Sequence, residues 1–244
     1  ILFIFNIFGY DIKRKNNFLD RKYNYIAEIN KEEKKTIEDF QKISLVSELN
    51  LWSINQSLRY IHNENIEGDV VECGVYNGST LSYIGNIINK RNLKKKIWGY
   101  DTFSGFVDKR YTEYDKDFKT NKLVDNKENE NNYFTLDEVK KNIKKNDKKD
   151  FDKYLFIKGD IIETLRIEEN LPKRICFLRL DTDLYTTTKI QLEILYPRLE
   201  KGGILHIDDY GLCPGVRKAV DEFFLGSNIW LHRVDITCRY LIKK

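Results

Sequence analysis

Two short apolar segments, each followed directly by acidic residues, constrain the fold of this chain most. Residues 175–180 precede Asp181, and residues 204–207 precede Asp208 and Asp209. The sequence between the two segments has apolar residues at helical spacing and ends before a pair of glycines, which indicates a strand, a helix and a second strand. We therefore expect a parallel crossover within a doubly wound, Rossmann-like α/β sheet.

This crossover predicts where the acidic residues meet. Neighbouring parallel strands lie about 4.8 Å apart, and a right-handed connection places their carboxyl ends at one edge of the sheet. Asp181 should then lie beside Asp208 and Asp209. Three carboxylates repel one another unless a proton or a cation lies among them, and ligands that are all oxygen favour a hard ion such as Mg²⁺. The sequence thus predicts a reaction centre at this edge.

Other segments extend the same architecture. Strand patterns recur before and after the crossover. Apolar and polar residues alternate in the two C-terminal segments, which is typical of an antiparallel hairpin. A helical segment precedes the first strand, and a helix follows the crossover. The predicted strands are residues 70–73, 96–101, 154–158, 229–234 and 239–242, and the two helices lie within residues 44–63 and 214–224.

A glycine turn follows the first of these strands. Glu72 precedes Gly74, and Gly78 completes a G-x-x-x-G spacing that differs from the G-x-G-x-x-G of nicotinamide sites. The glycines allow a tight bend and the close approach of a ligand, and the following helix offers unpaired N–H groups. A carboxylate before the turn would repel a pyrophosphate, so we expect a ligand with a cationic or hydroxylated part.

Two more carboxylates end the neighbouring strands, and each has two interpretations. Asp101 could bind the hydroxyls of a ribose, as acids do at this place in doubly wound sheets, or it could cap a turn or helix. Asp160 could hydrogen-bond a base or cap the helix that follows it.

The composition also changes along the chain. We expect an N-terminal helical segment over residues 1–65 and a main domain over residues 66–244, with a polar insertion at about residues 108–150 that could form a lid. A disordered surface loop is the alternative for residues 112–132. Within the insertion, a capping-box pattern at Thr135 predicts a short helix over residues 136–145.

Bulk properties exclude several classes of function. The net charge of +4, from 42 basic and 38 acidic residues, is too balanced to indicate nucleic-acid binding. The apolar start, residues 1–8, is far shorter than the ~20 residues of a membrane-spanning helix. The four cysteines form no CxxC pair and two fall in strand-like segments, which predicts reduced thiols and a cytoplasmic location. Because no methionine occurs, even at position 1, we expect a fragment or an altered sequence.

Taken together, several stretches resemble one enzyme family. They are GDVVECGVYNGST, WGYDTFSGF, the GD at residues 159–160, FLRLDTDLYTTT, LYPRLEKGGILHIDDYG and GVRKAVDEFF. In this order they are similar to class I S-adenosylmethionine methyltransferases of the macrocin O-methyltransferase type, which methylate sugar hydroxyls with Mg²⁺. The N-terminal segment and the insertion differ from the better-known members, so the acceptor could be a glycosylated natural product, a polysaccharide precursor or a nucleotide sugar.

The resemblance implies roles for individual residues. Asp101 would bind the ribose of S-adenosylmethionine and Asp160 the adenine side. Asp181, Asp208 and Asp209 would hold Mg²⁺, with Asp181 also the catalytic general base and a cofactor contact. The other cofactor-binding candidates are Glu72, Gly74, Tyr76, Gly78, Ser79, Thr80 and Thr102, and the substrate candidates are Asp183, Tyr185 and Tyr210.

Some residues keep a structural interpretation beside the functional one. His206 lies one step further into the sheet than Asp208, so we expect a core histidine and not the base. Asp183 could cap the next helix instead of binding substrate. Arg179 and Arg217 are expected to be structural ion-pair partners, with anchoring of an acidic sugar as the alternative.

Three other functions remain as alternatives. A related metal-dependent enzyme could methylate a phenolic or catechol acceptor. A hydroxylase or oxidoreductase could reuse the scaffold, although its iron site would need a histidine and only His206 is near. A catalytically silent sugar-binding protein is the third, which the presence of all three aspartates argues against. The acceptor is expected to be a small molecule or carbohydrate, and a homodimer is one open alternative for the subunit number.

Overall fold

The computed structural model describes residues 26–115, 133–147 and 150–244. The chain forms two compact units, Ile1–Thr36 and Ile37–Lys244, and helix α3 (Lys31–Gln41) crosses the boundary between them. The predicted division at residue 65 stays a prediction. The apolar start of the chain and most of the predicted loop at residues 112–132 lie outside the described residues.

The second unit is built on a seven-stranded sheet with the order β3-β2-β1-β4-β5-β7-β6. The first five strands are parallel, and β7 joins β5 antiparallel, as does β6 with β7. This order confirms the predicted doubly wound sheet with its antiparallel C-terminal hairpin. The strands are β1 (Asp69–Cys73), β2 (Ile97–Asp101), β3 (Tyr154–Lys158), β4 (Ile175–Leu180), β5 (Leu199–Ile207), β6 (His232–Arg233) and β7 (Arg239–Ile242).

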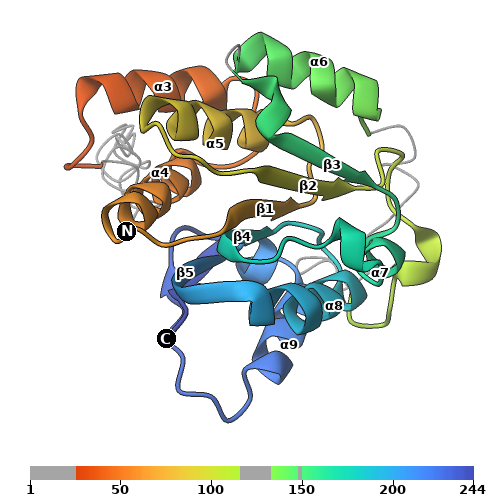
Figure 1. The fold of residues 1–244 in the computed structure, drawn as a ribbon. Coiled ribbons are helices and arrows are strands. Elements are labelled where there is room, and N and C mark those ends of the chain that lie inside the picture. The colour runs from red at the N-terminus through yellow and green to blue at the C-terminus, as the bar shows by residue number, and fades with distance from the viewer. Residues whose placement is uncertain (1–25, 116–132, 148–149) are drawn as a thin grey trace, which may run out of the picture. The chain divides into compact units, whose positions relative to one another are not determined.

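Helices cover both faces of the sheet. Figure 1 shows α4, α5 and α6 on one side and α7, α8 and α9 on the other. The described part of the chain contains no helix that could span a membrane. The bounds are α4 (Glu48–Asn63), α5 (Ser79–Lys90), α6 (Leu136–Asn146), α7 (Ile161–Thr164), α8 (Tyr185–Leu195) and α9 (Pro214–Phe223), with 3₁₀ turns η1 (Asp108–Arg110), η3 (Phe151–Lys153), η4 (Glu168–Asn170), η5 (Tyr196–Arg198) and η6 (Asp209–Gly211).

Several helices begin at side-chain caps that satisfy their free N–H groups. The Ser47 hydroxyl accepts a hydrogen bond from the Asn50 N–H at the start of α4. At α6, Thr135 and Glu138 form a complete capping box, which confirms the helix predicted in the insertion. Such caps are each worth about 1 kcal/mol of helix stability, so they fix where these helices start.

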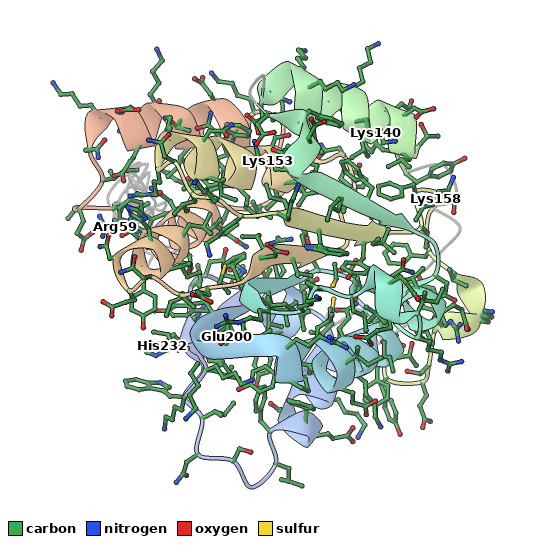
Figure 2. The ribbon with its side chains drawn as sticks, in the orientation of Figure 1. Arg59, Lys140, Lys153, Lys158, Glu200 and His232 are labelled. Atoms are coloured by element: carbon green, nitrogen blue, oxygen red, sulfur yellow. The ribbon has the colours of Figure 1, made fainter. Side chains whose placement is uncertain are left out.

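A buried polar network attaches α6 to the sheet. The Lys153 ammonium, just before β3, donates to Asp147 at 2.6 Å and to Asn89 of α5 at 3.1 Å (Figure 2). The Tyr154 hydroxyl donates to the same Asp147 carboxylate at 2.6 Å. A Cβ at Gly85 would lie 1.7 Å from the Tyr154 hydroxyl oxygen, so only glycine allows this close packing.

Both faces of the sheet centre are covered, because β1, β4 and β5 are almost continuously buried. The core between the sheet and the helices α7, α8 and α9 includes Val71, Leu178, Leu192, Leu205 and Val220. Cys73 in β1 and Cys176 in β4 are buried, as their apolar surroundings predicted. This rigid core fixes the carboxyl ends of the strands, which is where the acidic residues lie.

Candidate active site

A cavity of about 840 Å³ opens at the carboxyl ends of the parallel strands. Its volume falls in the range that accommodates a small-molecule ligand. Residues from the ends of β1, β2 and β3 line one part of it, and residues after β4 and β5 line another. The predicted site residues among its walls are Gly74, Tyr76, Ser79, Thr80, Asp101, Thr102, Asp160, Asp181, Asp183, Asp208 and Asp209.

The register of the sheet brings distant residues into one row. Cys73 pairs with Leu180 of β4, and Leu180 pairs with Ile207 of β5. The ladder continues one step further, because the Asp181 N–H donates to the Cys73 carbonyl and the Asp208 N–H to the Leu180 carbonyl, both at 2.9 Å. Asp181 and Asp208 are therefore direct neighbours across adjacent strands.

The predicted meeting of three carboxylates is confirmed by this geometry. Asp181, Asp208 and Asp209 each offer an oxygen, and these atoms all lie within 4.8 Å of one another. Asp183 and the thiol of Cys213 form a second such group with Asp209. The role of the three aspartates as metal ligands stays a prediction, but their positions suit one hard cation.

Arg179, which lies in β4 two residues before Asp181, neutralises part of the negative charge of this acidic cluster. Its guanidinium is fully buried and pairs with Glu72 at 2.9 Å, with Asp181, and with Asp208 at 3.2 Å. Its predicted role as a structural ion-pair partner is thus confirmed. Arg217, by contrast, donates to the carbonyl oxygens of Tyr210 and Gly211, both at 3.2 Å. Arg217 is structural through hydrogen bonds to the backbone.

The placement of Glu72 differs from the expectation that it lines the cofactor site. Glu72 and Arg179 are register partners on β1 and β4, so their side chains share one face of the sheet. Glu72 is fully buried and is not part of the cavity wall. Burial raises the pKa of Glu72 to about 8, with Asp181 and Asp208 adding to the shift and Arg179 opposing it. Glu72 therefore supports the cluster from within the sheet.

Two aspartates of the cluster, Asp208 and Asp209, also favour protonation when no cation is bound. Burial, then the charge of Asp181, raises the pKa of Asp208 to about 7. Burial and the neighbouring carboxylates of Asp183 and Asp181 raise the pKa of Asp209 well above its ordinary value. The Asp209 Oδ2 atom is buried without a hydrogen-bond partner. Such a cluster needs positive charge to hold its ionised form.

Asn50 of α4 is a site residue that the sequence reasoning missed. It is buried, it lines the cavity, and its amide donates to Asp208 Oδ1 at 2.5 Å. Its own Oδ1 atom is buried and has no hydrogen-bond partner. No sequence pattern distinguished it, because α4 contains several other polar residues, among them Ser53, Asn55 and Gln56.

The glycine turn is held by Asp101. Its Oδ2 accepts from the N–H groups of Val75 at 2.7 Å and Tyr76 at 3.0 Å, and its Oδ1 accepts from Phe103 N–H at 2.7 Å. The turn-capping interpretation of Asp101 is thus confirmed, and its place in the cavity wall keeps the ribose role open.

Gly74 and Gly78 are each required in the turn for a different structural reason. A Cβ at Gly74 would lie 1.7 Å from the Asp181 carbonyl oxygen, so the approach of β4 demands glycine. Gly78 has φ +79°, and a Cβ there would lie 3.0 Å from Val139 and 3.1 Å from Ile143 of α6. Gly78 does not line the cavity, and its predicted cofactor contact is replaced by helix packing.

Asp160 caps α7 and also anchors a missed cavity residue. Its Oδ1 accepts from the Ile162 N–H at 3.1 Å, which confirms the capping alternative. Its Oδ2 accepts from Arg110 Nε at 2.7 Å, and Arg110 also pairs with Glu163 at 2.6 Å. Arg110 comes from the polar insertion, where no sequence pattern distinguished it from other basic residues.

Of the three substrate candidates, the structure places one at the cavity. Asp183 lines it and does not cap α8, whose cap residue makes no side-chain hydrogen bond. The first N–H of α8, from Tyr185, donates instead to Asp115 at 2.7 Å. Tyr185 and Tyr210 lie outside the cavity wall, because their hydroxyls bond to Glu222 and Asp221 of α9, respectively.

His206 is a core residue, as expected. It is fully buried, its ring nitrogens lie 3.3 and 3.5 Å from the Cys238 sulfur, and it is absent from the cavity wall. Burial, then the positive charge of Arg179, lowers its pKa to about 3. Because this imidazole is enclosed in the core and does not line the cavity, it cannot reach an acceptor hydroxyl and does not serve as the base.

Comparisons with known proteins agree with this architecture. The demethyldecarbamoylnovobiocin O-methyltransferase of Streptomyces niveus is 28% identical over 217 residues, which cover 87% of this chain and 79% of that protein. The mycinamicin III 3''-O-methyltransferase of Micromonospora griseorubida is 30% identical over 164 residues, 66% of this chain and 61% of that protein. The solved structure of the O-methyltransferase NovP has a TM-score of 0.74 at 26% identity and covers 82% of each chain.

The family model of the macrocin O-methyltransferases (TylF) matches residues 12–243, nearly the whole chain. Together with the sheet order and the related O-methyltransferases, this match confirms the resemblance stated from the sequence motifs. The chain belongs to the macrocin O-methyltransferase family of S-adenosylmethionine-dependent methyltransferases and is an O-methylating enzyme.

Proposed function

We propose that this enzyme transfers a methyl group from S-adenosylmethionine to a sugar hydroxyl, with Mg²⁺ held by Asp181, Asp208 and Asp209. The observation that carries the proposal is the convergence of these carboxylates, within 4.8 Å, on the wall of the cavity. Two related enzymes support a sugar acceptor: one is named for the 3'' hydroxyl of mycinamicin III, and the other, from Streptomyces olivaceus, for the 4' position of a rhamnosyl-tetracenomycin.

The charges in the cluster fit a divalent cation. Five acidic side chains meet there, and the buried Arg179 supplies one positive charge to them. The unpartnered Asp209 Oδ2 offers an oxygen that no protein donor satisfies. A divalent ion would compensate this excess of negative charge, and carboxylate oxygens are the ligands that Mg²⁺ prefers. The five acids are Glu72, Asp181, Asp183, Asp208 and Asp209.

The other part of the cavity would hold the methyl donor. Gly74 and Tyr76 lie at the end of β1, Asp101 and Thr102 at the end of β2, and Asp160 beyond β3. An acidic cavity also favours the positive sulfonium. S-adenosylmethionine supplies an activated methyl group when bound, and Mg²⁺ would lower the pKa of a hydroxyl that it coordinates.

The chain itself would align the reactants and accept a proton. Asp181 lies at the cluster and is half-buried, so its carboxylate could accept the proton of the acceptor hydroxyl. Arg179 fixes Asp181 and Asp208 by ion pairs, and Asn50 orients Asp208 through its amide. Positioning of oxygen, carbon and sulfur in line would then provide much of the rate enhancement.

Calorimetric titration with S-adenosylmethionine, and separately with NAD, with and without Mg²⁺, tests the binding part of the proposal. We expect S-adenosylmethionine to bind with a free energy of roughly -8 kcal/mol, a micromolar Kd, and NAD not to bind. Methyl transfer to a panel of glycosides and catechols, in Mg²⁺ or in a chelator, tests the reaction. Transfer to catechol alone, or transfer unaffected by chelation, would contradict the proposal.

Asp181→Asn separates catalysis from cofactor binding. The amide cannot accept the proton and is a weaker ligand than a carboxylate, so turnover should fall by at least ~10²-fold while S-adenosylmethionine still binds. Asp137→Asn, which changes an exposed acid in the first turn of α6, is the matched control. Loss of cofactor binding with normal metal affinity in Asp181→Asn would mean that the assigned roles are reversed. The cytoplasmic location and the homodimer remain predictions.

A further inference from the structure

A second group of possible metal ligands lies beside the three aspartates of the proposed Mg²⁺ site. It consists of Asp183, Asp209 and Cys213, which offer two carboxylate oxygens and a sulfur, and these atoms all lie within 4.8 Å of one another. Cys213 directly precedes α9 and does not line the large cavity. The group therefore extends the acidic cluster away from the cavity, and the proposed methyl transfer does not use its thiol.

Asp209 is the residue that the two groups share. It is 8% exposed, and its Oδ2 atom is buried without a hydrogen-bond partner. A buried carboxylate oxygen that no donor satisfies costs free energy unless a proton or a cation lies against it. Because a carboxylate has two oxygens, Asp209 can bind one cation on each side, as in two-metal sites whose ions lie about 3.5–4 Å apart.

The spacing of the second group suits a tetrahedral ion. The Cys213 sulfur lies 4.0 Å from Asp183 Oδ1. Ligand atoms around Zn²⁺ are about 3.4–3.6 Å apart, given Zn–O and Zn–S distances of about 2.1 and 2.3 Å. A contraction of about half an ångström would therefore bring this pair to coordination distance. The Cys213 side chain makes no cap hydrogen bond to α9, so coordination would not cost the helix a cap.

The charges of the cluster favour a second cation. When ionised, the four aspartates of the two groups carry four negative charges, whereas Arg179 and one Mg²⁺ supply three positive charges. Arg179 pairs with Asp181 and Asp208, so the remaining negative charge is concentrated at Asp183 and Asp209. A cation beside these two carboxylates would compensate it.

The donor atoms select the kind of ion. Mg²⁺ binds oxygen ligands, whereas Zn²⁺ readily binds a thiolate together with carboxylates. We propose that Asp183, Asp209 and Cys213 form a second metal site that prefers Zn²⁺ and shares Asp209 with the Mg²⁺ site. Coordination would displace the thiol proton to solvent, and water would take the fourth position. Because Asp209 is shared, this inference rests in part on the proposed function.

A shared carboxylate couples the two sites. Zn²⁺ beside Asp209 would attract the charge of this carboxylate and repel a second divalent ion. Filling the Zn²⁺ site should therefore weaken Mg²⁺ binding by about 5-fold or more, and it should lower the rate of methyl transfer when Mg²⁺ is limiting.

Co²⁺ is a spectroscopic probe for the second site, because a thiolate ligand gives this ion an intense charge-transfer band in the near ultraviolet. The full chain, saturated with Mg²⁺ so that the three aspartates are occupied, is titrated with Co²⁺. We expect the band to reach its maximum at an equimolar amount of Co²⁺ and to disappear when Zn²⁺ is added. Calorimetry then measures Mg²⁺ affinity with and without an equimolar amount of Zn²⁺.

Variants identify the ligands. Cys213→Ala should abolish the band and lower Zn²⁺ affinity by at least ~10-fold. Cys176→Ala is the matched control, because it removes a buried thiol near the amino end of β4 and should leave the band intact. Asp183→Asn keeps the thiol, and asparagine tolerates the positive φ of 61° at this position. It should also weaken Zn²⁺ binding, and circular dichroism checks that each variant is folded.

The outcomes separate the two proposals. The second site would be overturned by the absence of a charge-transfer band, by a band that persists in Cys213→Ala or is lost in Cys176→Ala, or by undiminished Zn²⁺ affinity in Asp183→Asn. Equal Mg²⁺ affinity with and without Zn²⁺ would contradict the sharing of Asp209. A band that depends on Cys213 in a protein that binds no Mg²⁺ would instead support the second site and contradict the proposed function.

Discussion

The buried pair of Arg179 and Glu72 allows a quantitative test of how the site is supported. Both side chains are fully buried, and their charged atoms lie 2.9 Å apart. With an effective dielectric constant near 20, two unit charges at this distance attract by roughly 6 kcal/mol before desolvation is subtracted. Removing one partner of such a pair typically costs about 3–5 kcal/mol, because the other charge is left buried. Arg179→Met should therefore destabilise the protein by a similar amount at high pH.

The pKa of Glu72 makes this cost depend on pH. Because burial raises that pKa to about 8, Glu72 is mostly protonated at pH 6 and mostly ionised at pH 9. A double-mutant cycle of Arg179→Met and Glu72→Gln should then give a coupling energy of about 1.5–3 kcal/mol at pH 6, for a hydrogen bond to a charged group, and about 3–5 kcal/mol at pH 9.

The assay is urea unfolding of the metal-free protein and its variants, followed by circular dichroism at both pH values. The cycle cancels the effects that each substitution has independently of the other. A coupling energy that is equal at pH 6 and pH 9, or below about 1 kcal/mol at both, would refute the idea that Arg179 stabilises an ionised Glu72.

Other predictions address the metal, the missed amide and the glycine turn. Because the folded-state pKa of Glu72 is raised from 4.5 to about 8, its contribution to stability is present at low pH and is lost as pH rises through that window. The free energy of unfolding of the metal-free protein should fall by about 2 kcal/mol between pH 6.5 and 8, and by less in Glu72→Gln. A free energy of unfolding, measured with urea, that stays constant or rises over this range would contradict this prediction. Mg²⁺ affinity, measured by calorimetry, should rise over pH 6–8 because the pKa of Asp208 is about 7 and its proton must leave on binding; a flat profile would argue against Asp208 as a ligand. Asn50→Leu should weaken Mg²⁺ binding and turnover by ~10-fold or more while the affinity for S-adenosylmethionine stays the same. Asn50→Asp should show whether a charged side chain can replace the amide. Normal metal affinity in Asn50→Leu would contradict the role of Asn50 in positioning Asp208. Gly78→Ala should cost at least ~1 kcal/mol because of its positive φ and the contact with Val139, and a neutral effect on the melting temperature would contradict that account.

Periodicity and strand-end residues were sufficient to predict the framework. Alternating or continuous apolar segments fix strands, 3.6-residue spacing fixes helices, and the handedness of parallel crossovers fixes which edge the strand ends share. From these rules alone, Asp181 could be expected beside Asp208 and Asp209, and the sheet register confirms this. The capping box at Thr135 was predictable for the same reason, since its hydrogen bonds are local in the sequence.

Tertiary packing decided which polar side chains face the cavity. Glu72 was expected at the ligand, but its register partner on β4 is Arg179, and the pair is buried within the sheet. Tyr210 follows the cluster directly in sequence. Its hydroxyl nevertheless donates a hydrogen bond to Asp221 of α9, and Tyr210 does not line the cavity.

The site residues that could not be predicted from the sequence lie on elements far along the chain from the strand ends that they contact. Asn50 reaches Asp208 from α4, across a separation of 158 residues, and Arg110 reaches Asp160 from the polar insertion. A sequence determines local backbone preferences and the direction of each strand, because these depend on neighbouring residues and chirality. Which side chains meet across the chain depends on how the helices pack on the sheet. The acidic centre was therefore predictable from its strands, whereas its partners were decided by the folded structure.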